Sequence, residues 1–169
     1  MTNSLVLSED AKRFAIAREI ERAKSMYYLS YGAIFPVMIT AGYLFCRVAN
    51  RKRLLFKRWP PAFRFMMYGA TSCIMSYAAV VLKDINNYWT EAELDKMTCN
   101  LGMKYAKGGV EYYDKQLKRN QALRTLVPEN AAKNSYNLNG DPWPSLFRPY
   151  KYRSITERMQ RCEKFVESS

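Results

Sequence analysis

Residues 27–46, YYLSYGAIFPVMITAGYLFC, form a run of twenty amino acids without a single charge. At about 1.5 Å of rise per residue, a helix of this length crosses the roughly 30 Å hydrocarbon layer of a membrane. A second charge-free run, FMMYGATSCIMSYAAVVL, occupies residues 65–82, between Arg64 and Lys83. Together the two runs predict a transmembrane hairpin with both flanking tails on one side of the membrane.

The composition of the first run favours a membrane over a protein core. Tyr27, Tyr28 and Tyr43 lie near its ends, where aromatic side chains meet the membrane–water interface. Pro36 lies in its middle, where a membrane helix tolerates a kink. The alternative is two buried helices of a soluble bundle. It is disfavoured because neither run has the polar face that a soluble helix normally carries.

The net charge of +12 is concentrated in the segment that joins the two runs. Residues 47–64 hold seven basic side chains and no acidic one. Short loops of this kind remain on the cytosolic or matrix side of a membrane. A nucleic-acid surface would instead spread its basic residues over a folded face, so we expect no nucleic-acid partner. The basic residues of this loop are Arg47, Arg51, Lys52, Arg53, Lys57, Arg58 and Arg64.

Small residues recur along the second run at helical spacing. They form a stripe on one helical face, which allows another helix to approach closely in lipid. The stripe serves either the packing of the hairpin itself or the binding of a partner's transmembrane helix, unless the small residues merely fill space. The predicted partner-helix face consists of Gly69, Ser72, Cys73, Ser76 and Ala79.

Helices are also expected on both sides of the hairpin. Residues 1–26 mix acidic and basic side chains and predict an amphipathic helix beside the membrane. Residues 84–169 predict a soluble, helical tail with an ordered loop at 128–150, where turn-forming residues are dense. The predicted fold class is therefore all-α. It comprises a two-span transmembrane hairpin, an amphipathic N-terminal helix and a polar helical C-terminal extension.

Local signals divide this tail into helices. Thr90 and Glu93 have the spacing of a capping box, which predicts that a helix begins there and continues to about residue 107. The consecutive glycines Gly108 and Gly109 predict a break or a kink, and a second helix is expected over residues 110–127.

Residue types needed for catalysis or metal binding are scarce. The chain has no histidine, which excludes histidine-based triads and zinc sites with histidine ligands. Its four cysteines form no C-x-x-C motif. We interpret Glu91, Glu93 and Asp95 as the acidic first turn of a helix rather than as paired catalytic carboxylates. We therefore expect no enzyme, no catalytic residue, no metal, no cofactor and no small-molecule substrate.

One part of the tail resembles a known family. The residues GGVEYY at 108–113, followed by NQALRTL at 120–126, are similar to the C-terminal segment of the transmembrane protein 177 family. The resemblance covers about residues 25 to 155 and implies that the chain corresponds either to the C-terminal half of longer members or to a shortened form. We expect this segment to form the soluble contact surface. Its residues are Gly108, Gly109, Val110, Glu111, Tyr112, Tyr113, Leu117 and Arg124.

The resemblance implies a role in the mitochondrial inner membrane. Such a protein would be a multi-pass, non-enzymatic scaffold or chaperone that stabilises newly made cytochrome c oxidase subunit II during assembly. Its implied partners are that subunit, a membrane chaperone and copper metallochaperones. Two alternatives remain open: a small oligomeric channel or carrier subunit, and a membrane-surface tether that binds anionic lipid through the basic loop.

Overall fold

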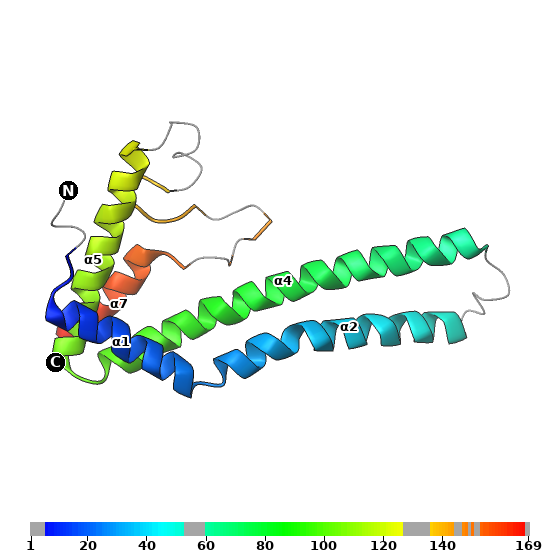
Figure 1. Cartoon of the computed structure of the whole chain (residues 1–169), viewed down its shortest axis with the longest axis horizontal. Coiled ribbons are helices and arrows are strands. Elements are labelled where there is room, and N and C mark those ends of the chain that lie inside the picture. Colours follow the sequence, from blue (N-terminus) through cyan, green and yellow to red (C-terminus); the bar gives the residue numbers. More distant parts are fainter. Residues whose placement is uncertain are drawn as a thin grey trace. The chain divides into compact units, whose positions relative to one another are not determined.

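The computed structural model of the chain describes residues 6–52, 60–126, 136–143, 147, 148, 150 and 153–167. Within these residues the chain forms five helices and no strand, apart from one isolated bridge. The chain divides into two compact units. We call Tyr28–Asn86 the hairpin unit, and Met1–Tyr27 together with Asn87–Ser169 the polar unit. The helices are α1 (Glu9–Lys24), α2 (Tyr27–Lys52), α4 (Pro61–Cys99), α5 (Met103–Leu126) and α7 (Ile155–Glu167) (Figure 1).

In the hairpin unit, α2 and α4 run antiparallel. The Asn50 Nδ2 atom donates to the Tyr68 hydroxyl at 2.6 Å near one end, and Asn86 Nδ2 donates to Ser30 Oγ at 3.2 Å near the other. Both helices are long and apolar enough to cross a membrane.

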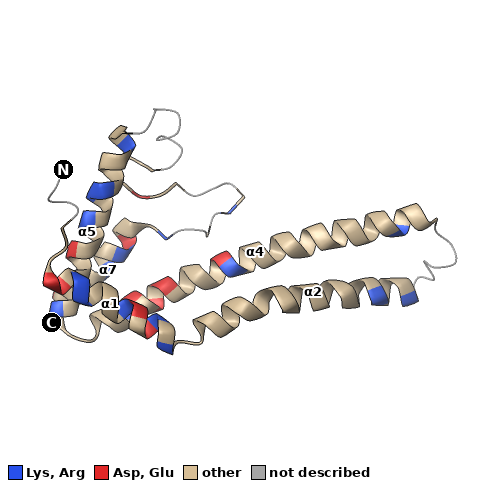
Figure 2. Cartoon of the chain, in the orientation of Figure 1, with Lys and Arg blue, Asp and Glu red and all other residues tan. Residues whose placement is uncertain are grey.

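In the apolar 18-residue stretches of α2 and α4, only 6% and 11% of the residues are buried within the molecule. The core helix of a soluble protein would be mostly buried. The side chains of these two stretches therefore face outward, toward lipid. Figure 2 shows long stretches of α2 and α4 without charge, with basic residues at the end of α2 and charged residues in the second half of α4. The predicted all-α fold with a two-span hairpin is confirmed.

The polar unit is built around α5. Helix α1 begins after Ser8, whose hydroxyl accepts the Ala11 backbone N–H at 3.2 Å, and Glu9 and Asp10 lie favourably in its first turn. Helices α1 and α7 both pack against α5. Their shared core consists of Phe14, Cys99, Ala106, Tyr113, Leu117, Ile155 and Cys162. Since α1 precedes the hairpin unit in sequence and α5 follows it, the two flanking segments pack together in one unit.

The tail helices begin and end elsewhere than predicted. Thr90 lies inside α4, which continues without interruption from the second span to Cys99. The break falls at Gly102, whose φ of 142° is a conformation that favours glycine, and α5 then runs straight through Gly108 and Gly109. The predicted helix start at residue 90 and the predicted glycine break are therefore wrong.

The predicted ordered loop is described at residues 136–143, 147, 148 and 150. Its visible turn is held on α5, because Asn120 Nδ2 donates to the Gly140 carbonyl oxygen at 2.9 Å. Within the turn, Asn137 Oδ1 accepts the backbone N–H groups of Asn139 and Asp141, both at 2.9 Å. The rest of the predicted loop, at 128–135, 144–146 and 149, lies outside the described residues.

Candidate functional site

The polar unit contains a buried network of charged side chains centred on Asp95 of α4. Asp95 is fully buried, and it accepts hydrogen bonds from Arg18 Nε of α1 at 3.0 Å and from Arg158 Nε of α7 at 2.6 Å. A second Arg158 nitrogen, Nη2, donates to Asp95 Oδ1 at 2.8 Å. The Tyr113 hydroxyl of α5 also donates to Asp95 Oδ1, at 2.6 Å. One carboxylate thus connects all four helices of the unit.

One turn before Asp95, Glu91 extends the network. Its carboxylate pairs with Arg18 and Arg22 of α1, and it lies 2.9 Å from Arg158 Nη2. Glu19 accepts hydrogen bonds from Arg22 at 2.9 Å and from Arg18 at 3.2 Å, which brings the formal charge of the cluster to zero. Each buried charge therefore has an oppositely charged partner, as burial requires.

The surroundings shift the pKa of three groups in this network. Burial alone would raise the pKa of Asp95, but the hydrogen bonds and charge of Arg158, together with Arg18 and Tyr113, leave it below its usual value. Burial raises the pKa of the Tyr113 hydroxyl well above its usual value. Burial lowers the pKa of Arg158, but the contact with Asp95 outweighs it and the pKa is raised. At neutral pH the aspartate and arginine are charged and the tyrosine is protonated.

A pair of glycines brings α5 into close contact with its neighbours. A Cβ atom added at Gly108 would lie 2.3 Å from the backbone oxygen of Asp10 in α1. One added at Gly109 would lie 2.8 Å from the Phe14 ring and 3.0 Å from Cys162 Sγ. Side chains are therefore excluded at both positions, and this explains why the glycines lie inside a helix.

Two cysteines meet in the core of the polar unit. Cys99 Sγ at the end of α4 lies 3.0 Å from Cys162 Sγ of α7, and both residues are buried. The hydrogen bond with Cys99 and burial together raise the pKa of the Cys162 thiol. A small cavity of about 150 Å³ reaches Cys99; its lining residues are Asp95, Lys96, Cys99, Arg161 and Phe165.

In the hairpin unit, the predicted partner-helix face is divided among three environments. Gly69 and Cys73 are exposed, and a Cβ atom added at Gly69 would meet nothing within 4 Å. Ser72 and Ser76 line a groove between α2 and α4. Ala79 is fully buried. Ser72 and Ser76 are exposed within the groove, and the exposed members of the stripe outside it are Gly69 and Cys73, one turn apart.

The predicted soluble contact segment is largely internal. Its two glycines, Tyr113 and Leu117 are buried in the unit's own core. Glu111 accepts the Ser8 backbone N–H at 3.2 Å and so holds the start of α1. Gly108 and Gly109 thus allow α1 and α7 to pack closely on α5, whereas the Glu111 side chain is half-exposed. The half-buried members are Val110, Tyr112 and Arg124.

The predicted basic loop is described only in part. Arg47 and Arg51 are exposed near the end of α2, and Arg64 is half-buried near the start of α4. Lys52 is the last residue of α2. The remaining predicted members, Arg53, Lys57 and Arg58, lie outside the described residues.

No sequence motif singles out the three arginines of the ion network. A spacing signal nevertheless exists. Arg18 and Arg22 are four residues apart in α1, and Glu91 and Asp95 are four residues apart in α4. Each pair therefore lies on one helix face. Two helix faces of opposite charge and equal spacing indicate elements that pair with each other.

Comparison with known proteins finds relatives over nearly the whole chain. The family model for transmembrane protein 177 matches residues 1–143. The transmembrane protein 177 of Danio rerio is 30% identical over 161 residues, which cover 95% of this chain and 51% of that protein. The Homo sapiens protein is 33% identical over 157 residues, covering 92% and 49% of the two chains. The chain thus spans about half the length of the curated relatives it matches. No solved structure matches it.

Proposed function

This chain belongs to the transmembrane protein 177 family, and we propose that it is a non-enzymatic scaffold of the mitochondrial inner membrane. Its task would be to stabilise newly made cytochrome c oxidase subunit II during assembly, alongside a membrane chaperone and copper metallochaperones. The membrane location follows from the family and the two apolar helices. The client and the organelle are part of the proposal.

The observation that carries the proposal is the open small-residue patch on α4. Gly69 and Cys73 are both exposed and leave space for another helix backbone to approach closely. On α2, Gly42 is buried against Met75 and Thr71, so the hairpin packs through a different small residue. The Gly69 and Cys73 patch is therefore free of the hairpin's own packing and suits a partner's transmembrane helix.

The polar unit suits a scaffold because its buried charged side chains form ion pairs with one another. Asp95 accepts hydrogen bonds from Arg18, Arg158 and Tyr113, and the pKa of Tyr113 is raised. Neither side chain is poised to exchange protons with a substrate near neutral pH. Such a cluster fixes the four helices in place and supports a rigid platform.

The proposal is tested by affinity capture of the tagged full chain from mitochondria after pulse-labelling of newly made organellar translation products. We expect selective recovery of labelled cytochrome c oxidase subunit II. The double variant Gly69→Leu/Cys73→Leu fills the open patch and should recover much less of it. The matched control is Ala70→Leu, an exposed position about 100° around the helix from Gly69.

Two results would count against this function. Recovery of no labelled translation product, with intact protein in the membrane, would remove the assembly role. Equal recovery by the double variant and by Ala70→Leu would remove α4 as the docking helix, while leaving a scaffold that acts through another surface.

A further inference from the structure

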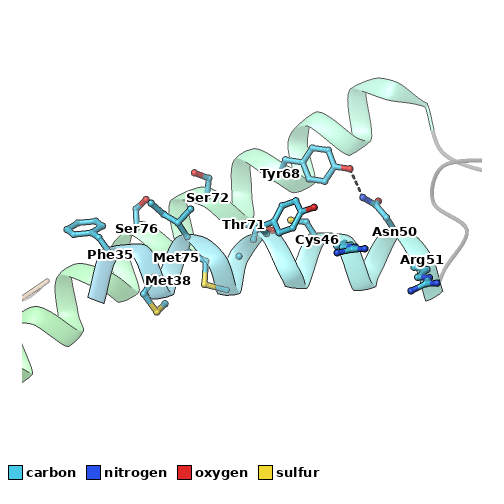
Figure 3. Close-up of a pocket in the computed structure, with 14 residues that line it drawn as sticks. Phe35, Met38, Cys46, Asn50, Arg51, Tyr68, Thr71, Ser72, Met75 and Ser76 are labelled. Carbon is cyan, nitrogen blue, oxygen red and sulfur yellow. Dashed lines mark hydrogen bonds between the residues drawn. The ribbon is translucent and has the colours of Figure 1, made fainter. Parts of the chain in front are cut away.

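An apolar groove separates α2 from α4 in the hairpin unit. Its volume is about 760 Å³, within the roughly 300–1,000 Å³ range of small-molecule sites. Met38, Gly42 and Met75 are among the residues that form its walls, with Phe35 at one end (Figure 3). Methionine side chains adapt to irregular, flexible apolar ligands.

The opposite end of the groove is polar and basic. Arg47 and Arg51 are among the lining residues. Asn50 and Tyr68 form a hydrogen bond at the same end of the groove as Arg51 (Figure 3). The Asn50 Oδ1 atom is buried and accepts no hydrogen bond from the described residues. This end therefore offers two cations and one unsatisfied polar atom to a ligand whose remainder lies along the apolar walls.

The apolar part of the groove is about as long as one leaflet of a membrane is thick. Cys46 ends the charge-free run and Phe35 lies eleven residues earlier, so the apolar part is about 16 Å long at roughly 1.5 Å per residue. One leaflet is about half of the roughly 30 Å hydrocarbon layer. The basic end then lies at the level of the lipid headgroups.

At its Phe35 end, the groove stops and does not continue into the other half of the membrane. Phe35 is the groove residue farthest from the loop, and the Lys83 ammonium lies 4.3 Å from the centroid of its ring and 4.2 Å from that of Tyr31. A partner's transmembrane helix needs a continuous face over both leaflets. A groove of one leaflet's depth instead suits an acyl chain.

We propose that this groove is a binding site for one anionic phospholipid. An acyl chain lies between α2 and α4, and the headgroup phosphate is bound by Arg47 and Arg51. Arginine forms paired, charge-assisted hydrogen bonds with phosphate oxygens. Asn50 Oδ1 accepts a hydrogen bond from a headgroup hydroxyl. Anionic lipid headgroups bind basic pockets between transmembrane helices in the same manner.

The test uses the purified full chain in detergent, equilibrated with equal amounts of phosphatidylglycerol and phosphatidylcholine carrying the same acyl chains. Native mass spectrometry then counts the lipids retained by each molecule. We expect one retained lipid with about a tenfold preference for phosphatidylglycerol. Inorganic phosphate at the same concentration lacks an acyl chain and should not displace it.

Three variants separate a site from general surface attraction. Arg47→Gln/Arg51→Gln should abolish the preference, whereas Arg47→Lys/Arg51→Lys keeps the charge without the paired hydrogen bonds and should retain part of the preference. Ser76→Phe places a ring in the groove and should reduce retention of either lipid, although it alters no charge. The matched charge control, Lys104→Gln/Lys107→Gln, removes two exposed cations from the polar unit and should change nothing.

Several outcomes would overturn the proposal. Equal retention of the two lipids by the natural chain would show that the basic end does not select a headgroup. Loss of preference in the Lys104 and Lys107 control would indicate nonspecific attraction to net charge. Unchanged retention by Ser76→Phe would show that lipid binds outside the groove, and displacement by inorganic phosphate would reduce the site to an anion site.

Discussion

Arg158 of α7 binds Asp95 of α4 through two parallel hydrogen bonds, Nε to Oδ2 at 2.6 Å and Nη2 to Oδ1 at 2.8 Å. The pair joins residues 63 positions apart in sequence, and Asp95 has no solvent exposure. Paired arginine–carboxylate contacts of this kind fix the orientation of both groups. The last helix of the chain is therefore held in register with the end of the second span's helix.

Replacing Asp95 with Asn should strongly destabilise the polar unit. The variant removes one of the two carboxylates that Arg158 and Arg18 share, the other being Glu91, and breaking a buried ion pair costs about 3–5 kcal/mol. Thermal unfolding followed by circular dichroism in detergent micelles measures the loss. The control is Asp114→Asn, which removes the exposed pair with Lys118 and should cost less than about 0.5 kcal/mol. Similar losses in both variants would contradict the central role of Asp95.

Acid should destabilise the polar unit in a way that depends on Asp95. The pKa of this carboxyl is lower in the folded chain than in the unfolded chain, where it is about 3.9. Its contribution is therefore fully present above about pH 4 and is lost as the pH falls through the lower, folded pKa. We expect the melting temperature of the natural chain to fall over this acidic range more steeply than that of Asp95→Asn. Parallel pH curves for the two proteins would exclude this linkage.

Replacing Gly108 with Ala should destabilise the unit, although alanine is the better helix former by about 1 kcal/mol. The new methyl group would lie 2.3 Å from the Asp10 backbone oxygen, so α1 must move away from α5. Overpacking of this kind costs about 1–3 kcal/mol. Chemical denaturation compares the variant with Gly69→Ala, whose methyl group meets nothing within 4 Å. A Gly108→Ala chain as stable as this control would show that α1 and α5 are not in close contact.

Oxidation should link Cys99 to Cys162. Diamide accepts two electrons and two protons from the paired thiols, and a disulfide forms between sulfur atoms that already lie 3.0 Å apart. The pKa of Cys162 is raised, so the reaction should be slow at neutral pH and faster in alkaline solution. The link should stabilise the unit by about 2–4 kcal/mol.

This oxidation is measured in a Cys46→Ser/Cys73→Ser background, in which only the paired cysteines remain. Alkylation under denaturing conditions should label two thiols before oxidation and none after it, with a rise in melting temperature. Labelling of both thiols after prolonged treatment at high pH would show that the side chains do not meet.

The two spans could be predicted from sequence because the absence of charge over 27–46 and 65–82 is a local property. Their helices nevertheless extend further than predicted, to Lys52 in α2 and to Cys99 in α4. A helix that is stabilised inside a membrane continues into water until a residue such as Gly102 stops it, and the stop carries little signal of its own. The capping-box spacing at Thr90 therefore does not mark a helix start.

The long-range contacts could not be predicted because their signals are ambiguous in one sequence. Consecutive glycines such as Gly108 and Gly109 mark either a turn or a close approach, and only the position of Asp10 decides between them. The acids at Glu91 and Asp95 suit a helix start as well as an ion network. The lipid groove depends on the spacing of two helices, which no local pattern specifies.

The division of the polar unit between the two ends of the chain has a consequence for synthesis on the ribosome. Helix α1 ends about eighty residues before α5 begins. At about 5–20 residues per second, α1 waits roughly 4–16 s for its packing surface, while both spans are being made. During that interval Phe14 lacks the core it packs into, and Arg18 lacks the carboxylate of Asp95 until α4 has been made. A nascent chain of this protein therefore passes through a stage in which it must itself be shielded from aggregation.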